Sequence, residues 1–250
     1  DKSIRSTTKE FELLDNAISE MMKRIQRSFN QERIFISHAS HELKTPISVL
    51  QSKLEAIFRD ENLNSYQSEK LMDMQDTLQK MKKSVNALLL ISKVNNAQFL
   101  KTETVDLKMV VDGIVEDWTE IAEEKGIQIR KEKIDPFTYS DTNLSLCHMM
   151  IQNGLSNAVK YVETGGEISL SGTKIGDRYA LVIENDGAGI DDTLIEQVKN
   201  GLVFLKDVSK EKSGFGLQIM YKVALFLGVS LEIGSQTGKT RVCFSFPMKA

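Results

Sequence analysis

Apolar side chains recur every three or four residues through the first part of the chain, and this period limits what the chain can fold into. The first run, spaced 3, 4, 3 and 4, consists of Phe11, Leu14, Ile18, Met21 and Ile25. This spacing is a heptad seam, which is typical of a helix that packs against another helix in a coiled coil or bundle. A lone surface helix is the less favoured alternative, because no other predicted element is near enough to cover the seam.

A second seam and a third helix continue the pattern to about residue 95. The second seam consists of Ile36, Ala39, Leu43, Ile47, Leu50, Leu54 and Ile57. After the turn-like "RDENLNSYQ" of residues 59–67, a third helix is predicted from about Ser68 to Asn95, with apolar positions Leu71, Met74, Leu78, Met81, Val85, Leu88 and Ile91. Two long helices with a short connection form an antiparallel hairpin. One hairpin buries too little core to be stable alone, so we expect two copies to form a four-helix bundle.

From about residue 102, helical and strand-like segments alternate. Helices are predicted for "LKMVVDGIVEDWTEIAEEKG", "NLSLCHMMIQNGLSNAVKYV" and "SGFGLQIMYKVALFLG". A strand is predicted for "IQIRKEKI", and hairpins for "GEISLSGTKIGDRYALVIEND" and "VSLEIGSQTGKTRVCFSFP". Helices interleaved with antiparallel strands indicate an α/β sandwich, with one sheet covered on one face. The predicted fold class is therefore α+β: a dimeric helical-hairpin four-helix bundle followed by an α/β sandwich.

Charge and composition exclude some classes of function. Residues 1–98 contain 15 Lys and Arg residues and 13 Asp and Glu residues, and residues 99–250 contain 17 and 22, respectively. Neither part is basic, so no nucleic-acid partner is expected. Cys147 and Cys243 lack metal-ligand spacing, which favours buried, reduced thiols in a cytosolic setting. With no signal peptide, no apolar run of roughly 20 residues and no initial Met, we expect a soluble fragment of a longer protein.

The segment "GSQTGKT" (residues 234–240) invites comparison with a phosphate-binding P-loop. That motif has four residues between its glycines and opens a helix, whereas three residues intervene here and the strand-like "RVCFSF" follows. A plain hairpin turn is therefore predicted.

The segment "ENDGAGID" suits the base of a nucleotide. The apolar "YALVI" leads to Asp186 at a strand end, where a carboxylate can accept a hydrogen bond from an exocyclic amine such as that of adenine. Gly187 and Gly189 let the backbone approach a flat ligand. Taken alone, a turn made by Asp and Gly is an equally good interpretation.

Two further segments suit phosphates. In "NGLSNAVKY", Asn153 and Asn157 share one helix face, and Lys160 follows on the next turn. Amide oxygens there suit a Mg²⁺ that keeps several waters and bridges phosphates; a polar surface face is the alternative. In "KSGFGLQI", two glycines precede an apolar helix, whose N-terminal N–H groups can bind an anion.

Taken in chain order, "NGLSNAVKY", "ENDGAGID" and "KSGFGLQI" resemble the N, G1 and G2 boxes of the ATP-binding domain of sensor histidine kinases, within the gyrase-type ATPase superfamily. "SHELKTP" (residues 40–46) resembles their H box, and the first residues resemble the end of a HAMP signalling segment. The resemblance implies a HAMP-like signalling helix over 1–30, a dimerisation and histidine phosphotransfer domain over 31–98, and a catalytic ATP-binding domain over 101–250. It also implies the cytoplasmic portion of an inner- or plasma-membrane protein, attached through segments absent from this chain.

The resemblance assigns roles by position. It implies that His41 accepts the phosphoryl group, that Glu42 is the neighbouring base, that Asn157 is the Mg²⁺ ligand with Asn153 beside it, and that Asp186 reads adenine. The other implied nucleotide-binding residues are Lys160, Tyr161, Gly187, Gly189, Lys206, Gly214, Phe215, Gly216, Leu217 and Thr240. The implied cofactors are ATP and Mg²⁺. The implied partners are a second copy, bound through the helical bundle, and the receiver domain of a response regulator, whose aspartate takes the phosphoryl group.

By helix geometry both His38 and His41 point away from the seam, and the neighbouring Glu42 favours His41 as the acceptor. At about 100° per residue His41 lies roughly 200° from Leu43, away from the seam. Glu42 can hydrogen-bond one ring nitrogen and leave the other as the nucleophile. His38 has no adjacent carboxylate and is interpreted as a surface residue, with a proton-relay role as the alternative. Pro46 should bend the helix just past the site.

Two positions bear on the fate of the phosphoryl group. Hydrolytic relatives place a Glu where Asn153 stands, so this site is expected to hold ATP without rapid hydrolysis. Thr45 lies one turn after His41, where the resemblance implies a residue that orients water to dephosphorylate the partner. A Thr that merely precedes Pro46 is an equally weighted alternative.

The chain departs from the family pattern at the G2 box, where Lys212 replaces a glycine, and in the lid between residues 191 and 214. Phe204 and Lys206 are the nearest remnants of the F box there, and Lys206, Lys210 or Lys212 could contact phosphate. Three rival functions remain: a degenerate kinase-fold scaffold or phosphatase-dominant member, a hydrolytic ATPase or clamp, and a dimerising coiled-coil adaptor.

Overall fold

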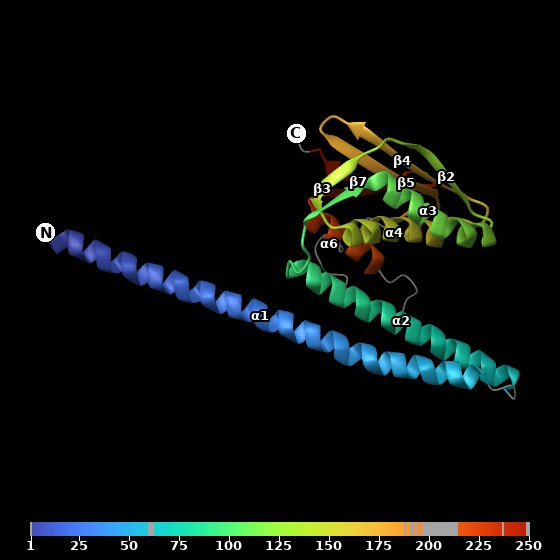
Figure 1. The fold of residues 1–250 in the computed structure, drawn as a ribbon, viewed down its shortest axis with the longest axis horizontal. Coiled ribbons are helices and arrows are strands. Elements are labelled where there is room, and N and C mark those ends of the chain that lie inside the picture. The colour runs from blue at the N-terminus through green and yellow to red at the C-terminus, as the bar shows by residue number, and fades with distance from the viewer. Residues whose placement is uncertain are drawn as a thin grey trace. The chain divides into compact units, whose positions relative to one another are not determined.

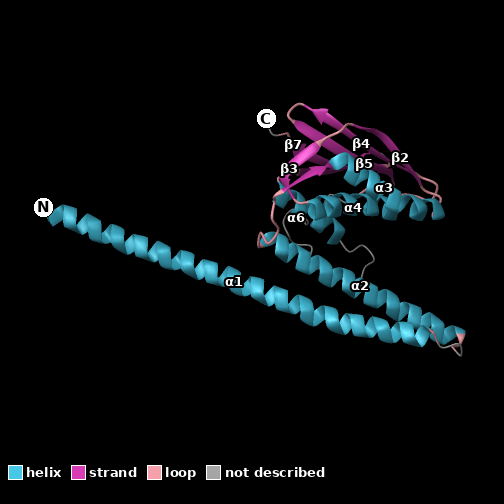
Figure 2. Cartoon of the chain, viewed as in Figure 1, coloured by secondary structure: helices cyan, strands magenta, loops and turns pink. Residues whose placement is uncertain are grey.

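The computed structural model describes residues 2–59, 63–187, 189–190, 193, 195–196, 215–236 and 238–248. Within that part, the side chains of residues 2–10, 32–33, 36–38, 40–41 and 236 are not described. The chain divides into two compact units, Asp1–Asn96 and Ala97–Ala250. The first is helical, and the second combines helices with strands (Figures 1 and 2).

The first unit is a helical hairpin of α1 (Lys2–Phe58) and α2 (Ser65–Asn95). Both predicted seams lie on the single helix α1, which continues through Pro46. Ile47 and Leu54 of α1 form a small core with two leucines of α2, Leu71 and Leu78. No helix in the described part of the chain is both long and apolar enough to span a bilayer.

Helix α2 begins three residues before the predicted start because of a capping box. The side chain of Asn64 accepts a hydrogen bond from the N–H of Gln67 (2.8 Å), and the Gln67 side chain accepts one from the N–H of Asn64 (3.0 Å). These reciprocal bonds satisfy two N–H groups at the hairpin turn. The turn-like segment therefore ends earlier than predicted.

Much of the predicted apolar seam stays exposed in the single chain. Leu43, Leu50 and Ile57 of α1, and Met74, Met81 and Leu88 of α2, are 44–57% exposed. Four of them, Leu50, Ile57, Met74 and Met81, line an apolar groove of about 550 Å³ along the hairpin. The hairpin thus leaves a continuous apolar face uncovered.

The second unit has a five-stranded sheet in the order β2-β4-β5-β7-β6. Its elements in chain order are β1 (Glu103–Asp106), α3 (Leu107–Glu124), β2 (Gln128–Ile134), β3 (Thr138–Thr142), α4 (Leu144–Tyr161), β4 (Glu167–Ile175), β5 (Arg178–Asp186), α6 (Phe215–Leu227), β6 (Ser230–Gln236) and β7 (Lys239–Pro247). Helices α3, α4 and α6 lie on one face of the sheet (Figure 2). The layered α/β architecture and both predicted hairpins are confirmed.

Two features of the strands differ from the prediction. Strand β2 pairs with β4 in parallel, not antiparallel, because strand β3 and helix α4 connect the two as a crossover rather than as a hairpin. Strands β1 and β3 form a separate two-stranded sheet that was not predicted. Their sequences, "ETVD" and "TYSDT", are too short and polar to stand out as strands.

The first residues of the second unit pack on its helix α6. The rings of Phe99 and Phe226 meet edge to face with centroids 6.5 Å apart. The Lys101 ammonium lies 4.7 Å from the centroid of the Phe226 ring and donates to the Phe226 carbonyl at 2.9 Å. That carbonyl belongs to the last turn of α6, where a cation is electrostatically favoured. We name this contact the linker clasp.

An aromatic cluster under the sheet requires a glycine at one point. The ring of Tyr179 stacks on Phe137 with centroids 4.5 Å apart, and its hydroxyl donates to the Asp135 carbonyl at 2.8 Å. Burial raises the pKa of Tyr179 to about 12, so the hydroxyl remains a donor. A Cβ on Gly172 would lie 2.2 Å from that hydroxyl oxygen and 3.0 Å from the carbon that bears it.

We expect Gly172→Ala to destabilise the second unit by about 1–3 kcal/mol, the usual cost of overpacking a core. The cost should be smaller in a Tyr179→Phe background, which removes the nearest atom. Thermal unfolding followed by the fluorescence of Trp118, the only tryptophan, measures both. Gly113→Ala is the control: a Cβ there has open space, and Ala favours the helix. Equal costs in both backgrounds would contradict the steric explanation.

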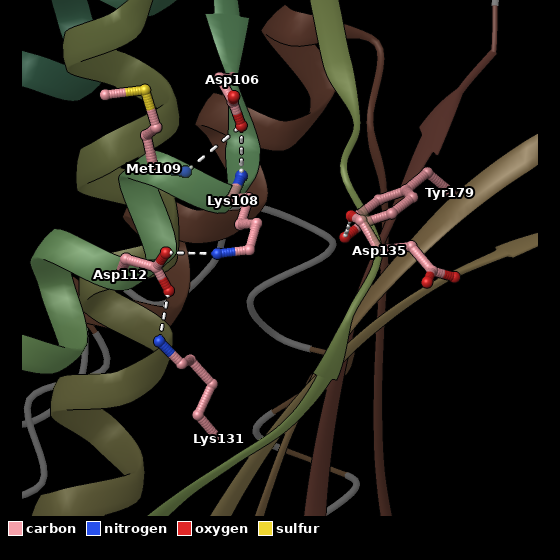
Figure 3. A network of polar contacts seen from close by, with 7 residues as sticks. All are labelled: Asp106, Lys108, Met109, Asp112, Lys131, Asp135 and Tyr179. Atoms are coloured by element: carbon pink, nitrogen blue, oxygen red, sulfur yellow. Dashed lines mark hydrogen bonds and ion pairs between the residues drawn. The ribbon is translucent and has the colours of Figure 1, made fainter.

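A charged network joins α3 to strand β2 (Figure 3). The carboxylate of Asp112 accepts from Lys108 at 2.8 Å and from Lys131 at 2.6 Å. At the start of the helix, Asp106 caps the N–H groups of Lys108 and Met109. The hydrogen bond from Lys108, then that from Lys131, holds the pKa of Asp112 below its ordinary value. The carboxylate therefore stabilises the folded state in its charged form.

This network predicts a pH-dependent stability. The Asp112 contribution is fully present above its unfolded pKa of about 3.9 and is lost as pH falls through the lower folded pKa. Asp112→Asn should therefore lower the Tm at pH 7, and the difference from wild type should shrink toward zero below about pH 3. Asp117→Asn on the same helix is the matched control. A difference that persists unchanged in acid would exclude the carboxylate as its cause.

Candidate nucleotide site

Helix α4 carries the predicted asparagines and packs closely on the sheet. It starts at the N-cap Asn143, which accepts from the N–H of Leu146 at 3.1 Å. A Cβ on Gly154 would lie 3.0 Å from Ile183 and 3.2 Å from Phe244 of the sheet. Glycine thus allows the helix to lie directly on β5 and β7. The neighbouring Asn153 sits off this contact and is half-buried.

The two predicted asparagines meet the start of α6. A Cβ on Gly216 would lie 3.2 Å from the amide oxygen of Asn153 and 3.2 Å from that of Asn157. The side chain of Asn153 donates to the Met149 carbonyl at 2.8 Å, which fixes the amide on its own helix. The structure therefore brings the N-box residues and the G2-box glycine into contact. Phe215 beside them is half-buried and Leu217 is buried.

Asp186 is the last residue of β5, as predicted. Its carboxylate accepts from the N–H of Glu167 at 3.0 Å, and its carbonyl accepts from the side chain of Asn185 at 2.8 Å. Thr240 is buried on β7 and pairs in register with Asn185. Asp186 and Thr240 therefore lie at the same end of the sheet, on adjacent strands.

The two predicted glycines after Asp186 lie where a side chain would not fit. Gly189 has φ +83°, which disfavours other residues. A Cβ on Gly187 would lie 2.7 Å from the carbonyl oxygen of Tyr161, and one on Gly189 would lie 2.7 Å from the hydroxyl of Ser235. The loop therefore passes directly between the end of α4 and strand β6.

Lys160 and Tyr161 end helix α4 next to this loop. Both are exposed, and the Lys160 ammonium lies 5.0 Å from the centroid of the Tyr161 ring. An exposed cation on an aromatic face at the end of the asparagine-bearing helix can contact an anionic ligand. The positions of both residues suit the predicted lining role.

Several predicted positions lie outside the described residues. They are Gly214, the lid residues Phe204, Lys206, Lys210 and Lys212, and the side chains of His38 and His41. Of the H box, Glu42 and Thr45 are exposed on α1. The cysteines are both free, but only Cys147 is buried, whereas Cys243 is half-buried. Burial raises the pKa of both thiols.

Sequence reasoning missed three residues of this region. The N–H of Glu167 donates to the carboxylate of Asp186, 19 residues away in sequence. The side chain of Ser235 accepts from the N–H of Ile190 in the loop after Asp186, 45 residues away. Gln218 is fully buried on α6, and neither of its amide atoms has a hydrogen-bond partner among the described residues. An apolar periodicity could not have singled out any of them.

Comparison with known proteins matches both units to families. Residues 31–97 match the His Kinase A (phospho-acceptor) domain, HisKA. Residues 142–250 match the HATPase_c family, described as histidine kinase-, DNA gyrase B-, and HSP90-like ATPase. The sensor protein RstB of Escherichia coli K12 is 27% identical over 244 residues, which cover 95% of this chain and 54% of RstB. The chain thus spans about half the length of this curated relative.

Solved structures share the fold. Acinetobacter baumannii histidine kinase AdeS has a TM-score of 0.58 and 21% identity, over 84% of this chain and 98% of that chain. Full-length ShkA in complex with AMPPNP has a TM-score of 0.67 and 19% identity, over 86% of this chain and 46% of that chain. The chain thus carries a HisKA phospho-acceptor domain followed by a histidine-kinase-type ATPase domain, which together are the core of a sensor histidine kinase.

Proposed function

We propose that this chain transfers the γ-phosphoryl group of ATP to His41 and passes it on to an aspartate of a response regulator. The observation that carries the proposal is the contact of Gly216 with the amides of Asn153 and Asn157. It brings a glycine at a helix N-terminus against two amide oxygens, and such a site suits phosphates and their metal ion. The HATPase_c match of residues 142–250 supports the same ligand.

The described residues fit ATP and Mg²⁺ in chemistry. The half-buried Asn157 would supply one oxygen ligand to a Mg²⁺ that keeps its waters and contacts phosphates. Asp186 would accept from the exocyclic amine of adenine with the carboxylate that the Glu167 N–H already orients. Lys160 and Tyr161 would line the pocket, and Gly187 and Gly189 keep the loop clear of side chains. When bound, the metal ion would neutralise phosphate charge during transfer.

The transfer step needs little from the first unit beyond an exposed nucleophile. The unprotonated nitrogen of His41 forms a bond to the γ-phosphorus, while the bond from that phosphorus to the β–γ bridging oxygen breaks. The electron pair of that bond leaves on ADP. Glu42, exposed next to His41 on α1, takes the proton from the other ring nitrogen as the ring becomes positively charged. Alignment and charge stabilisation account for most of the rate.

The uncovered apolar face supports a homodimer. Leu50, Ile57, Met74 and Met81 line a groove that a single hairpin leaves open to solvent. A second copy brings the same residues to the same face, and the result is a four-helix bundle. The proposed domains are those predicted, with a HAMP-like helix over 1–30, the phosphotransfer domain over 31–98 and the catalytic domain over 101–250. Membrane attachment through further segments and a cytoplasmic site of action belong to the same proposal.

A degenerate scaffold or phosphatase-dominant member is the second candidate. The replacement of a G2-box glycine by Lys212 favours it, since the lid residues that would contact phosphate also depart from the family pattern. A hydrolytic ATPase is disfavoured by Asn153, because an amide is not a base. Labelling with ATP separates these candidates from the kinase.

Incubation of the chain with γ-labelled ATP and Mg²⁺ should produce acid-labile, base-stable protein label. His41→Gln should abolish the label, because it removes the nucleophile, whereas His38→Gln on the same helix should retain it. Asn157→Ala should reduce the label at least about tenfold, as expected for a lost metal contact. Nucleotide binding without label would support the scaffold, and free phosphate without a phosphoprotein would support the ATPase.

We further propose that Thr45 orients the water that removes phosphate from the partner receiver domain. Thr45 lies four residues after His41, about one helical turn along α1, and is exposed. Thr45→Ala should leave His41 labelling intact and slow the loss of phosphate from a receiver domain phosphorylated by this chain. Thr45→Asn should retain the activity, since an amide can also orient water. An unchanged rate in Thr45→Ala would reduce Thr45 to a residue that precedes Pro46.

A further inference from the structure

The "GSQTGKT" turn between β6 and β7 does more than reverse the chain. The N–H of Gly187 donates to the carbonyl of Gly238 at 2.9 Å. The N–H of Ile190 donates to the side-chain oxygen of Ser235 at 2.8 Å. Both bonds tie the loop that follows Asp186 to the β6–β7 hairpin, from opposite sides of Gly189.

The pairing of β6 with β7 and of β7 with β5 fixes the position of Ser235 relative to Asp186. Ser235 pairs with Thr240 of β7, and Thr240 pairs with Asn185 of β5, so the three residues form one rung across the sheet. Asn185 directly precedes Asp186. The Ser235 hydroxyl therefore belongs to the sheet itself, in the row of paired residues next to Asp186, the proposed adenine-binding residue.

The fit between Ser235 and the loop is close. At Gly189 a Cβ would lie 2.7 Å from the Ser235 hydroxyl and 2.8 Å from its Cβ, so the loop backbone rests directly on this residue. Two hydrogen bonds, at Gly187 and Ile190, and a direct packing contact, at Gly189, act on this loop. A loop held in this way does not have to be ordered when a ligand arrives, and preorganisation of that kind increases affinity.

We propose that Ser235 is a positioning residue for the nucleotide: its hydroxyl holds the Gly189–Ile190 backbone in the conformation that faces the base. This inference rests on the proposed function, because it assumes that Asp186 and the following loop bind the adenine of ATP. Ser235 acts through the loop and does not touch the reacting phosphate. Its loss should therefore weaken nucleotide binding and leave the rate of transfer at saturating ATP unchanged.

The test uses the full 250-residue chain with the variants Ser235→Ala and Ser235→Cys. Cysteine keeps nearly the same shape but accepts hydrogen bonds weakly. Ser171→Ala is the control, since Ser171 is a serine on β4 of the same sheet. Calorimetric titration with AMPPNP and Mg²⁺ gives Kd, hydrogen exchange gives the protection of the Ile190 amide, and labelling of His41 gives KM and the maximal rate.

For Ser235→Ala we expect loss of protection at Ile190, a Kd about tenfold higher, a raised KM and an unchanged maximal rate. Ser235→Cys should lie between Ala and wild type, and Ser171→Ala should match wild type. Lost protection with unchanged Kd would overturn the positioning role and leave Ser235 as a structural brace. Unchanged protection would overturn the hydrogen bond itself. Failure of the wild-type chain to bind AMPPNP would instead overturn the proposed function, and with it the role of Ser235.

Discussion

The nucleotide site depends on the packing of α4 between two neighbours that approach it through glycines. Gly154 lets the helix lie on Ile183 and Phe244 of the sheet, and Gly216 lets the start of α6 reach the amides of Asn153 and Asn157. A methyl group at either glycine would stand 3.0–3.2 Å from its neighbours. Because cores are packed to the density of organic crystals, such contacts leave the helix little room to shift. The asparagines are thereby fixed relative to both the sheet and α6.

The motifs of the site could be predicted from sequence because each is local. Asp186 at a strand end and the asparagines one turn apart on a helix follow from period and order alone, and their elements are confirmed. What escaped prediction joins distant segments: the parallel pairing of β2, the β1–β3 sheet and the Ser235–Ile190 hydrogen bond. The capping box at Asn64 is the exception, since its spacing was visible in the sequence. Non-local pairing is decided by the packing of the whole domain, which single-sequence patterns do not contain.

The linker clasp marks the first residues after α2 that pack on the second unit's helices. Phe99 and Lys101 lie only three and five residues after Asn96, yet they pack on the last turn of α6. Between them the carbonyl of Leu100 accepts from the side chain of Asn143, the N-cap of α4. The end of α6 and the start of α4 therefore bind residues 99–101. Elsewhere on the same two helices, Gly216 of α6 contacts Asn153 and Asn157 of α4. The connection that remains outside these contacts is short, only Ala97 and Gln98.

The residue at position 153 bears on whether a site of this fold suits hydrolysis of ATP by water or transfer of its phosphoryl group to another nucleophile. Its side-chain N–H group donates to the Met149 carbonyl, so the amide is held on its own helix with its oxygen beside Gly216. An amide oxygen is too weakly basic to take a proton from water, whereas a carboxylate at this position would be a general base. Under the proposed function, water in this site would not be activated, and bound ATP would persist until a stronger nucleophile arrives. In the proposed reaction that nucleophile is His41, which belongs to the other unit of the chain, so the proposed transfer depends on the conformation of the chain.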